Sequence, residues 1–130
     1  MKLAIAALTL FTAAASAQQQ QQPLTKDGPA LYRYYCASCH GMEAKGDGPL
    51  AKALKTPPPD LTKISARNHG KFPLERVNKI IAGDEGATKA HGSKDMPVWG
   101  PFFSQVENDQ DAGPVRIDNL ARYLRKIQKP

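Results

Sequence analysis

Cysteine and histidine are scarce in this sequence, which has 130 residues but only two cysteines and three histidines. Small secreted domains that rely on disulfides carry several cysteine pairs at regular spacing, so that class of protein is excluded. A structural zinc site needs four ligands, and no second cysteine or histidine pair stands elsewhere in the chain to complete one. The chemistry of the two cysteines must therefore be judged from their spacing and their immediate neighbours.

Strand-like alternation and apolar runs long enough to span a membrane are also missing. No stretch alternates apolar and polar residues over the length of a strand, so we expect an all-α domain. The one long apolar run, residues 3–14, is too short to span a bilayer comfortably. It follows a positively charged start and precedes an Ala-Ser-Ala cleavage pattern, as in signal peptides. We predict a signal peptide over residues 1–17, a disordered glutamine-rich leader over 18–26, and one domain over 27–130.

Acidic residues are fewer than basic ones, 12 against 18, which leaves a formal charge of +6. On an exported chain without a recognition motif, this excess argues against nucleic acid as a partner. No cysteine follows the apolar run closely enough to accept a lipid. We therefore expect cleavage after Ala17 to release a mature chain that is soluble and has no permanent membrane anchor.

The two cysteines stand three apart and are followed at once by a histidine, in Cys36-Ala37-Ser38-Cys39-His40. This is the attachment motif of c-type haem. Positions i and i+3 share a helix face, so both thiols can reach the two vinyl groups of one porphyrin, and His40 can ligate its iron. A thioredoxin-like CxxC, a local disulfide and half of a zinc site are the alternatives. No βαβ pattern surrounds the motif, which favours one covalently attached haem c.

The first helix is expected to lead directly into this motif. Asp27 is a good N-cap residue, and Pro29 falls in the first turn, where its missing N–H costs nothing. Leu31, Tyr34 and Tyr35 follow at helical spacing and form the predicted apolar stripe. The haem would then be attached at the C-terminal end of a helix.

Two more main helices and an irregular segment should follow. The second helix covers residues 73–81 and stops at Gly83. Residues 96–103 are densely apolar but broken by prolines and glycine, so we expect an irregular segment laid against a large apolar object. The last helix starts between Pro114 and Asp118. Its apolar face carries Ile117, Leu120, Leu124 and Ile127. The resulting fold has three main helices plus short helical pieces and loops wrapped around one haem.

The residue on the second axial position of the iron decides whether the haem carries electrons or binds ligands. The candidates are Met42, His69, His91 and Met96. Met42 is two residues past the motif and cannot swing to the far face of the ring. Met96 lies in the apolar segment, beside a stiffening proline, and is favoured as the thioether ligand, with an ordinary core methionine as the alternative. The two histidines lie in polar stretches and remain alternatives.

Together these features resemble the class I mono-haem bacterial cytochromes c. The matching stretches are Gly28, Tyr32, the haem motif with Gly41, Gly46-Asp47-Gly48-Pro49, Pro58-Pro59-Asp60-Leu61-Thr62, Met96-Pro97-Val98-Trp99-Gly100 and residues 120–128. The haem motif is highly specific, and the Met-Pro-x-Trp-Gly pattern is moderately so. The resemblance implies a cytochrome c fold, haem c thioethers at Cys36 and Cys39, and His40 and Met96 as axial ligands.

The resemblance also implies roles for residues around the haem. In the family a proline that follows a glycine usually offers its carbonyl to Nδ1 of the haem histidine, and Pro49 matches this position. The first and last helices of the family cross at a glycine and an aromatic residue, here Gly28 and Tyr123. Trp99 would pack near the haem or donate to a propionate, with simple core packing as the alternative.

The function that this resemblance implies is electron transfer rather than enzymatic catalysis. With both axial positions filled, the iron exchanges electrons without binding a substrate. We expect a monomeric periplasmic carrier between a respiratory or dehydrogenase donor and an acceptor such as a terminal oxidase, docking through its basic surface. Lysines that only solubilise the surface are the alternative. A haem c subunit held in a dehydrogenase or oxidase complex and a haem protein with an open iron site are the rival functions.

Overall fold

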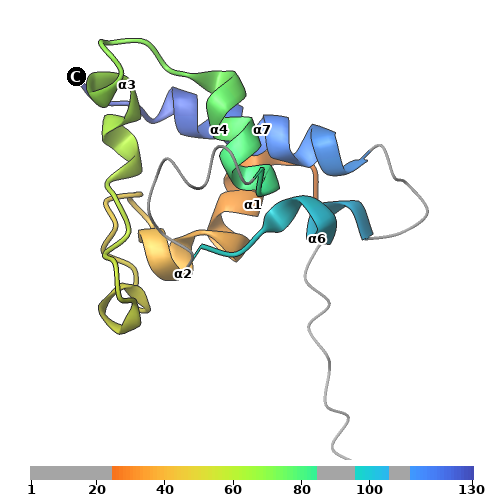
Figure 1. Cartoon of the computed structure of the whole chain (residues 1–130), viewed down its shortest axis with the longest axis horizontal. Coiled ribbons are helices and arrows are strands. Elements are labelled where there is room, and N and C mark those ends of the chain that lie inside the picture. Colours follow the sequence, from red (N-terminus) through yellow and green to blue (C-terminus); the bar gives the residue numbers. More distant parts are fainter. Residues whose placement is uncertain (1–24, 85–95, 106–111) are drawn as a thin grey trace, which may run out of the picture.

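The computed structural model describes residues 25–84, 96–105 and 112–130 (Figure 1). Every regular element within these ranges is a helix, which confirms the predicted all-α class. In chain order the helices are α1 (Gly28–Tyr35), α2 (Ala37–His40), η1 (Ala51–Ala53), η2 (Leu61–Lys63), α3 (Ile64–Arg67), α4 (Leu74–Ala82), α6 (Trp99–Gln105) and α7 (Ala112–Lys126). None of the helices in the described ranges is long and apolar enough to cross a membrane. The predicted signal peptide and most of the predicted leader lie outside these ranges.

Helix α7 is the element against which α1, α4 and α6 all pack (Figure 1). Its buried face contains Ile117, Leu120 and Leu124, as the periodicity predicts, and Ile127 is partly buried against the same core. The other large core side chains come from the three neighbouring helices and include Leu31, Tyr32, Val77, Ile81 and Phe103. Burial of these side chains against one long helix supplies the main apolar contact of the fold.

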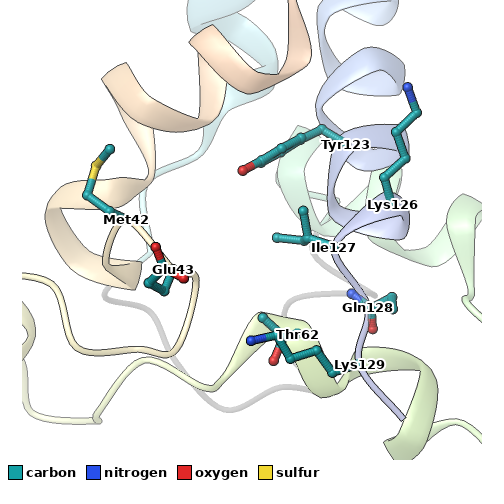
Figure 2. Close-up of a pocket in the computed structure, with 8 residues that line it drawn as sticks. All are labelled: Met42, Glu43, Thr62, Tyr123, Lys126, Ile127, Gln128 and Lys129. Atoms are coloured by element: carbon teal, nitrogen blue, oxygen red, sulfur yellow. The ribbon is translucent and has the colours of Figure 1, made fainter.

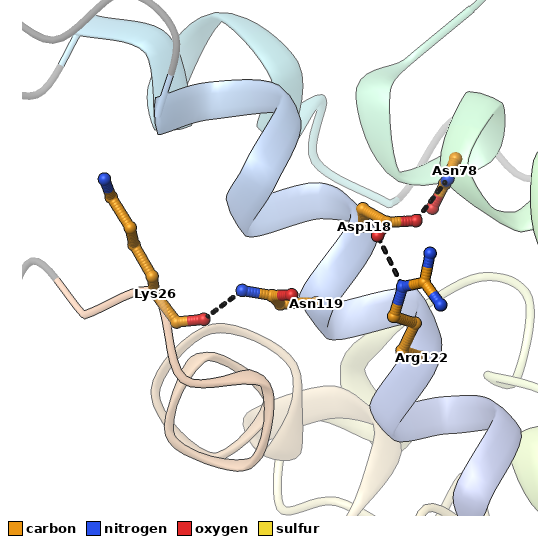
Figure 3. Close-up of polar contacts among 5 residues, drawn as sticks. All are labelled: Lys26, Asn78, Asp118, Asn119 and Arg122. Atoms are coloured by element: carbon orange, nitrogen blue, oxygen red, sulfur yellow. Dashed lines mark hydrogen bonds and ion pairs between the residues drawn. The ribbon is translucent and has the colours of Figure 1, made fainter.

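Polar contacts along α7 hold two neighbouring elements (Figure 3). The side-chain amide of Asn119 donates to the Lys26 carbonyl, just before α1, at 2.8 Å. The amide of Asn78 in α4 donates to the Asp118 carboxylate at 3.3 Å, and Arg122 donates to the same carboxylate from the next turn. The hydrogen bond from Arg122 holds the pKa of Asp118 below its ordinary value. Helix α7 therefore holds both α1 and α4 through polar as well as apolar contacts.

Helix α1 begins where the sequence predicts, but its buried face differs from the predicted stripe. The Asp27 side chain caps the helix by accepting from the backbone N–H of Ala30 at 3.0 Å. Tyr34 is 48% exposed, so its place in the predicted stripe is wrong. The buried residues are Gly28, Leu31 and Tyr32. The side of α1 around Gly28 packs on α7, which leaves Tyr34 on the open side of the helix.

The crossing of α1 and α7 occurs at Gly28, as expected. A Cβ placed on Gly28 would lie 3.0 Å from the Asn119 carbonyl carbon and 3.0 Å from the Cβ of Tyr123, and would collide with the Asn119 oxygen. The rings of Tyr32 and Tyr123 also meet across this crossing, with centroids 5.4 Å apart. A residue with a side chain at this position would push the two helices apart, which explains a glycine inside the first turn of α1.

Two boundaries differ from the prediction, and proline is the reason in both cases. Residues 96–103 are not wholly irregular, since α6 begins at Trp99. Helix α7 begins at Ala112, before the predicted start between residues 114 and 118. Pro101 and Pro114 each occupy the third position of their helix. In that first turn a missing N–H breaks no intrahelical bond, so both helices begin ahead of their proline. Helix α6 adds a fourth helix to the three main helices expected.

Helix α4 matches the predicted second helix within one residue at each end. Val77 and Ile81 are its buried residues and face the common core. Gly83 follows with φ +87°, the left-handed conformation that commonly ends helices, so the predicted stop is confirmed.

Candidate functional site

The haem motif forms a tight helical turn at the end of α1. Cys36 joins α1 to α2: its N–H donates to the Tyr32 carbonyl at 2.9 Å. Its own carbonyl accepts from the N–H groups of Cys39 at 3.1 Å and His40 at 2.9 Å. The two cysteines are unpaired and partly buried. The expected placement of the motif at the C-terminal end of a helix is therefore confirmed.

The Cys36 thiol lacks the lowered pKa that marks the reactive thiol of a disulfide exchange site. Burial raises the pKa of the Cys36 thiol to about 12, and nearby Cys39 adds to the rise. Thiol–disulfide exchange needs the opposite, a lowered pKa that supplies thiolate at neutral pH. The described residues also contain no group of three or more histidine, cysteine or acidic residues able to hold a metal ion. Within the described part of the chain, the arrangement fits neither a thioredoxin-like site nor a zinc site.

The segment after the motif folds back over α2 and binds its last carbonyls. The N–H of Gly46 donates to the His40 carbonyl at 2.8 Å, and that of Gly48 donates to the Cys39 carbonyl at 3.1 Å. The N–H of Leu50 donates to the Ser38 carbonyl at 2.9 Å. The carbonyls at the end of a helix have no partner within the helix, so these three bonds replace the missing ones. They fix the backbone of both Cys39 and His40.

The His40 ring has one buried nitrogen without a well-formed hydrogen bond. Among the described residues, no group pairs with its Nδ1 in good geometry. Burial lowers the pKa of the ring, and a hydrogen-bonding interaction with the Pro59 backbone raises it. The backbone of Pro59 thus acts on the ring, and the role expected of Pro49 stays a prediction. Pro49 is exposed on the outer segment that binds the α2 carbonyls.

These residues fit a covalently attached haem. Two free thiols lie one turn apart beside a histidine whose Nδ1 is enclosed by protein. A histidine whose one ring nitrogen is buried in the protein can present the other, Nε2, to a metal. The proline segment that carries Pro59 is tied to the site by a 2.7 Å bond from the Leu61 N–H to the Ala44 carbonyl. The chain therefore supplies two thiols for covalent attachment and a partly enclosed histidine directly beside them.

Tyr32 supports the site in a way that sequence reasoning missed. Its hydroxyl donates to the carbonyl of Gly41, the residue after His40, at 2.6 Å. The ring is only 2% exposed, and burial raises the pKa of its hydroxyl. An aromatic residue four positions before Cys36 looks like any core residue, so only the folded chain shows which carbonyl it meets. Tyr32 thereby connects α1 to the residue that follows the haem histidine.

Replacing Tyr32 with phenylalanine should lower the free energy of unfolding by about 1–2 kcal/mol, because a buried hydrogen bond is lost while the ring stays. Urea unfolding would measure the change. Tyr34→Phe is the matched control: it removes a hydroxyl from an exposed side chain on the same helix and should change stability little. Equal losses in the two variants would contradict a specific role for the Tyr32 hydroxyl.

The segment that carries Met96 approaches the motif through an aromatic cluster. Met96 is partly buried and lies three residues before α6. The ring of Trp99 lies 5.4 Å from that of Tyr35, the residue before Cys36, and stacks on Phe103 at 5.8 Å. Core packing, one of the two expectations for Trp99, is thus observed, and its contact with the haem stays a prediction. Met96 as a ligand also stays a prediction.

The other candidate ligands are less well placed. Met42 is 63% exposed and lines a groove of about 370 Å³ between its own loop and the C-terminal end of α7. In Figure 2 the Tyr123 hydroxyl points across this groove toward the loop of Met42. His69 is exposed in a turn with φ +54°. His91 lies outside the described residues.

Comparison with known protein families gives a match over most of the chain. The family described as Cytochrome c matches residues 25–128. This range contains the haem motif, Met96 and every described helix. Comparison with individual curated proteins and with solved structures gives no match.

Proposed function

Because the chain belongs to the cytochrome c family, whose members bind covalently attached haem c, we propose that it is a soluble periplasmic carrier of single electrons. Cys36 and Cys39 would hold the haem, and His40 and Met96 would ligate its iron. The bound haem supplies exchange between Fe(III) and Fe(II), the chemistry of an electron-transfer protein rather than an enzyme. The periplasmic location rests on the signal-peptide pattern of residues 1–17.

The observation that carries this proposal is the construction around His40. The ring nitrogen Nδ1 is enclosed, the His40 carbonyl is bound by Gly46, and the following carbonyl is bound by Tyr32. A proximal ligand held from several sides keeps its geometry when the charge of the metal changes. Such rigidity suits a site whose only chemistry is the gain and loss of one electron.

The choice of Met96 as the second ligand is supported by its surroundings. Met96 is partly buried, whereas Met42 and His69 are exposed. The segment of Met96 is joined through Trp99 to the end of α1, beside the motif. Bound to the iron together with His40, the neutral and soft thioether of Met96 would favour Fe(II) and raise the reduction potential.

Met96→Ala is expected to abolish the weak far-red band of the ferric protein, lower the reduction potential and open the ferrous iron to carbon monoxide. Met42→Ala removes the same side chain from an exposed position and should leave all three properties unchanged. Haem staining of a denaturing gel must first show covalent attachment. Rapid binding of carbon monoxide by the unaltered protein would favour the open-site alternative, a haem enzyme or gas sensor.

The partners are proposed from charge. Residues 45–71 run along one side of the molecule, shown in gold to green in Figure 1, and include the segment that binds α2. They contain six cations, Lys45, Lys52, Lys55, Lys63, Arg67 and Lys71, but only two acidic residues, Asp47 and Asp60. This side would dock on acidic faces of a donor and an acceptor in brief encounters. Stable co-purification with a dehydrogenase or oxidase would instead identify a permanent subunit.

A further inference from the structure

The segment that carries Met96 docks on the C-terminal end of α4 through two glycines. The side chain of Val98 fills the space beside Gly83: a Cβ on Gly83 would collide with Val98 Cγ1 and lie 3.0 Å from its Cβ and Cγ2. Two residues further on, Gly100 lies against the backbone of Ala82. A Cβ there would collide with the Ala82 oxygen and lie 3.2 Å from its carbonyl carbon and Cα. Both contacts need glycine because the chains approach without room for a side chain.

The residue between these two contacts ties the same segment to the haem motif. Trp99 packs against Tyr35, with centroids 5.4 Å apart, and Tyr35 directly precedes Cys36. The segment is therefore held at one side by the end of α4 and at another by the end of α1. Because Met96 lies only three residues before Trp99, these contacts restrict where Met96 lies relative to the two cysteines.

We propose that Gly83 and Gly100 are positioning residues for Met96, which set where its sulfur stands relative to the haem bound at the motif. The inference rests on the proposed ligation of the iron by His40 and Met96. Site groups must be held within roughly 0.5 Å of their working geometry, and a methyl group in place of the Gly100 hydrogen needs a shift of about 1 Å. A thioether is a neutral donor, so charge attraction does not hold it on the metal when its backbone moves.

A variant at Gly100 tests the inference directly. Gly100→Ala should weaken or abolish the ferric far-red band, lower the reduction potential and let carbon monoxide bind the ferrous haem. Gly113→Ala is the matched control, because a Cβ on Gly113 would collide with Ser104 Oγ and lie 3.1 Å from its Cα, at another contact of α6. This control should lower stability yet keep the band, the potential and the resistance to carbon monoxide.

A second pair of variants separates steric displacement from backbone strain. Gly83→Ala introduces both a collision with Val98 and strain at φ +87°. Val98→Ala removes Cγ1, which collides, and Cγ2, which lies 3.0 Å away, but it does not relieve the strain; alone it should change the spectrum less than Gly83→Ala does. The double variant should regain much of the far-red band that Gly83→Ala loses. Rescue of the spectrum without full rescue of stability is the signature of a positioning role.

Two results would overturn the inference: a wild-type band and potential in folded Gly100→Ala, or the same spectral loss in the Gly113→Ala control. If Gly100→Ala does not fold, Gly83→Ala with and without Val98→Ala decides the matter, and absence of rescue rejects the proposal. Failure of the proposed ligation looks different. In that case Met96→Ala itself keeps the far-red band of the unaltered protein.

Discussion

Gly48→Ala is expected to destabilise the haem-binding end of the protein by about 3 kcal/mol, the upper end of the cost of overpacking. A Cβ on Gly48 would lie 2.5 Å from the Ser38 oxygen, 2.6 Å from the Cys39 carbonyl carbon and 2.7 Å from the Ala37 oxygen. All three are backbone atoms of α2, so no side-chain rotation relieves the overlap. The segment would have to lift off the motif and release the carbonyls of Cys39 and Ser38.

The measurement is urea unfolding of the haem-loaded protein, together with the yield of covalently attached haem. Displacement of the Cys39 backbone should lower that yield as well as the stability. Gly70→Ala is the control, because Gly70 has φ +77° but its Cβ would meet nothing within 4 Å. It should cost roughly 1 kcal/mol through left-handed backbone strain alone. Equal losses at the two positions would show that close approach to α2 is not what requires glycine at Gly48.

Replacing Arg116 with methionine should lower the free energy of unfolding by about 2–3 kcal/mol, the value of hydrogen bonds made by a charged group. Arg116 is only 4% exposed. Its Nη1 donates to the Phe103 carbonyl at 3.0 Å, and its Nε donates to the Thr25 carbonyl at 3.2 Å. Methionine keeps most of the apolar stem but leaves both carbonyls without this donor. The side chain joins α7 to α6 and to the segment before α1.

Arg122→Met provides the comparison on the same helix. Arg122 is about half exposed and pairs with Asp118 across one helical turn (Figure 3). Solvent screens such a pair, so its loss should cost only about 0.5 kcal/mol. Thermal or urea unfolding of both variants would show whether burial sets the difference. If the two arginines contribute equally, the buried bonds of Arg116 add nothing beyond those of a surface pair.

Local sequence signals predicted the features that depend on neighbouring residues. The spacing of Cys36, Cys39 and His40 puts all three in one helical turn wherever that turn lies. Asp27 as a cap and Gly83 as a stop also act within a few residues of themselves, and both are confirmed. The same local reasoning missed α6, because it treats the prolines and glycine of residues 96–103 as breaks, although a proline in the first turn of a helix is tolerated.

Features that depend on distant partners could not be predicted in this way. Pro49 and Pro59 both stand in plausible stretches, and only the folding of the segment after the motif brings Pro59 to His40. Tyr32 matched the family pattern without an assigned role, and only the fold brings its hydroxyl to the Gly41 carbonyl. Arg116 carries no sequence signal of its own, yet it is only 4% exposed in the folded chain. In each case the contact joins two residues whose separation along the chain is not the spacing of a helix or a turn.

By itself, the sequence determined the haem motif, the all-α class and the family, because these follow from short spacings and from residue types in order. Only the tertiary structure decided which glycines lie against another backbone, which proline faces the haem histidine, and how the Met96 segment is held between α4 and α1. The physical reason is that close packing brings atoms from distant parts of the chain into contact. The structural role of a missing Cβ or of a single hydroxyl depends on the group that folding places beside it.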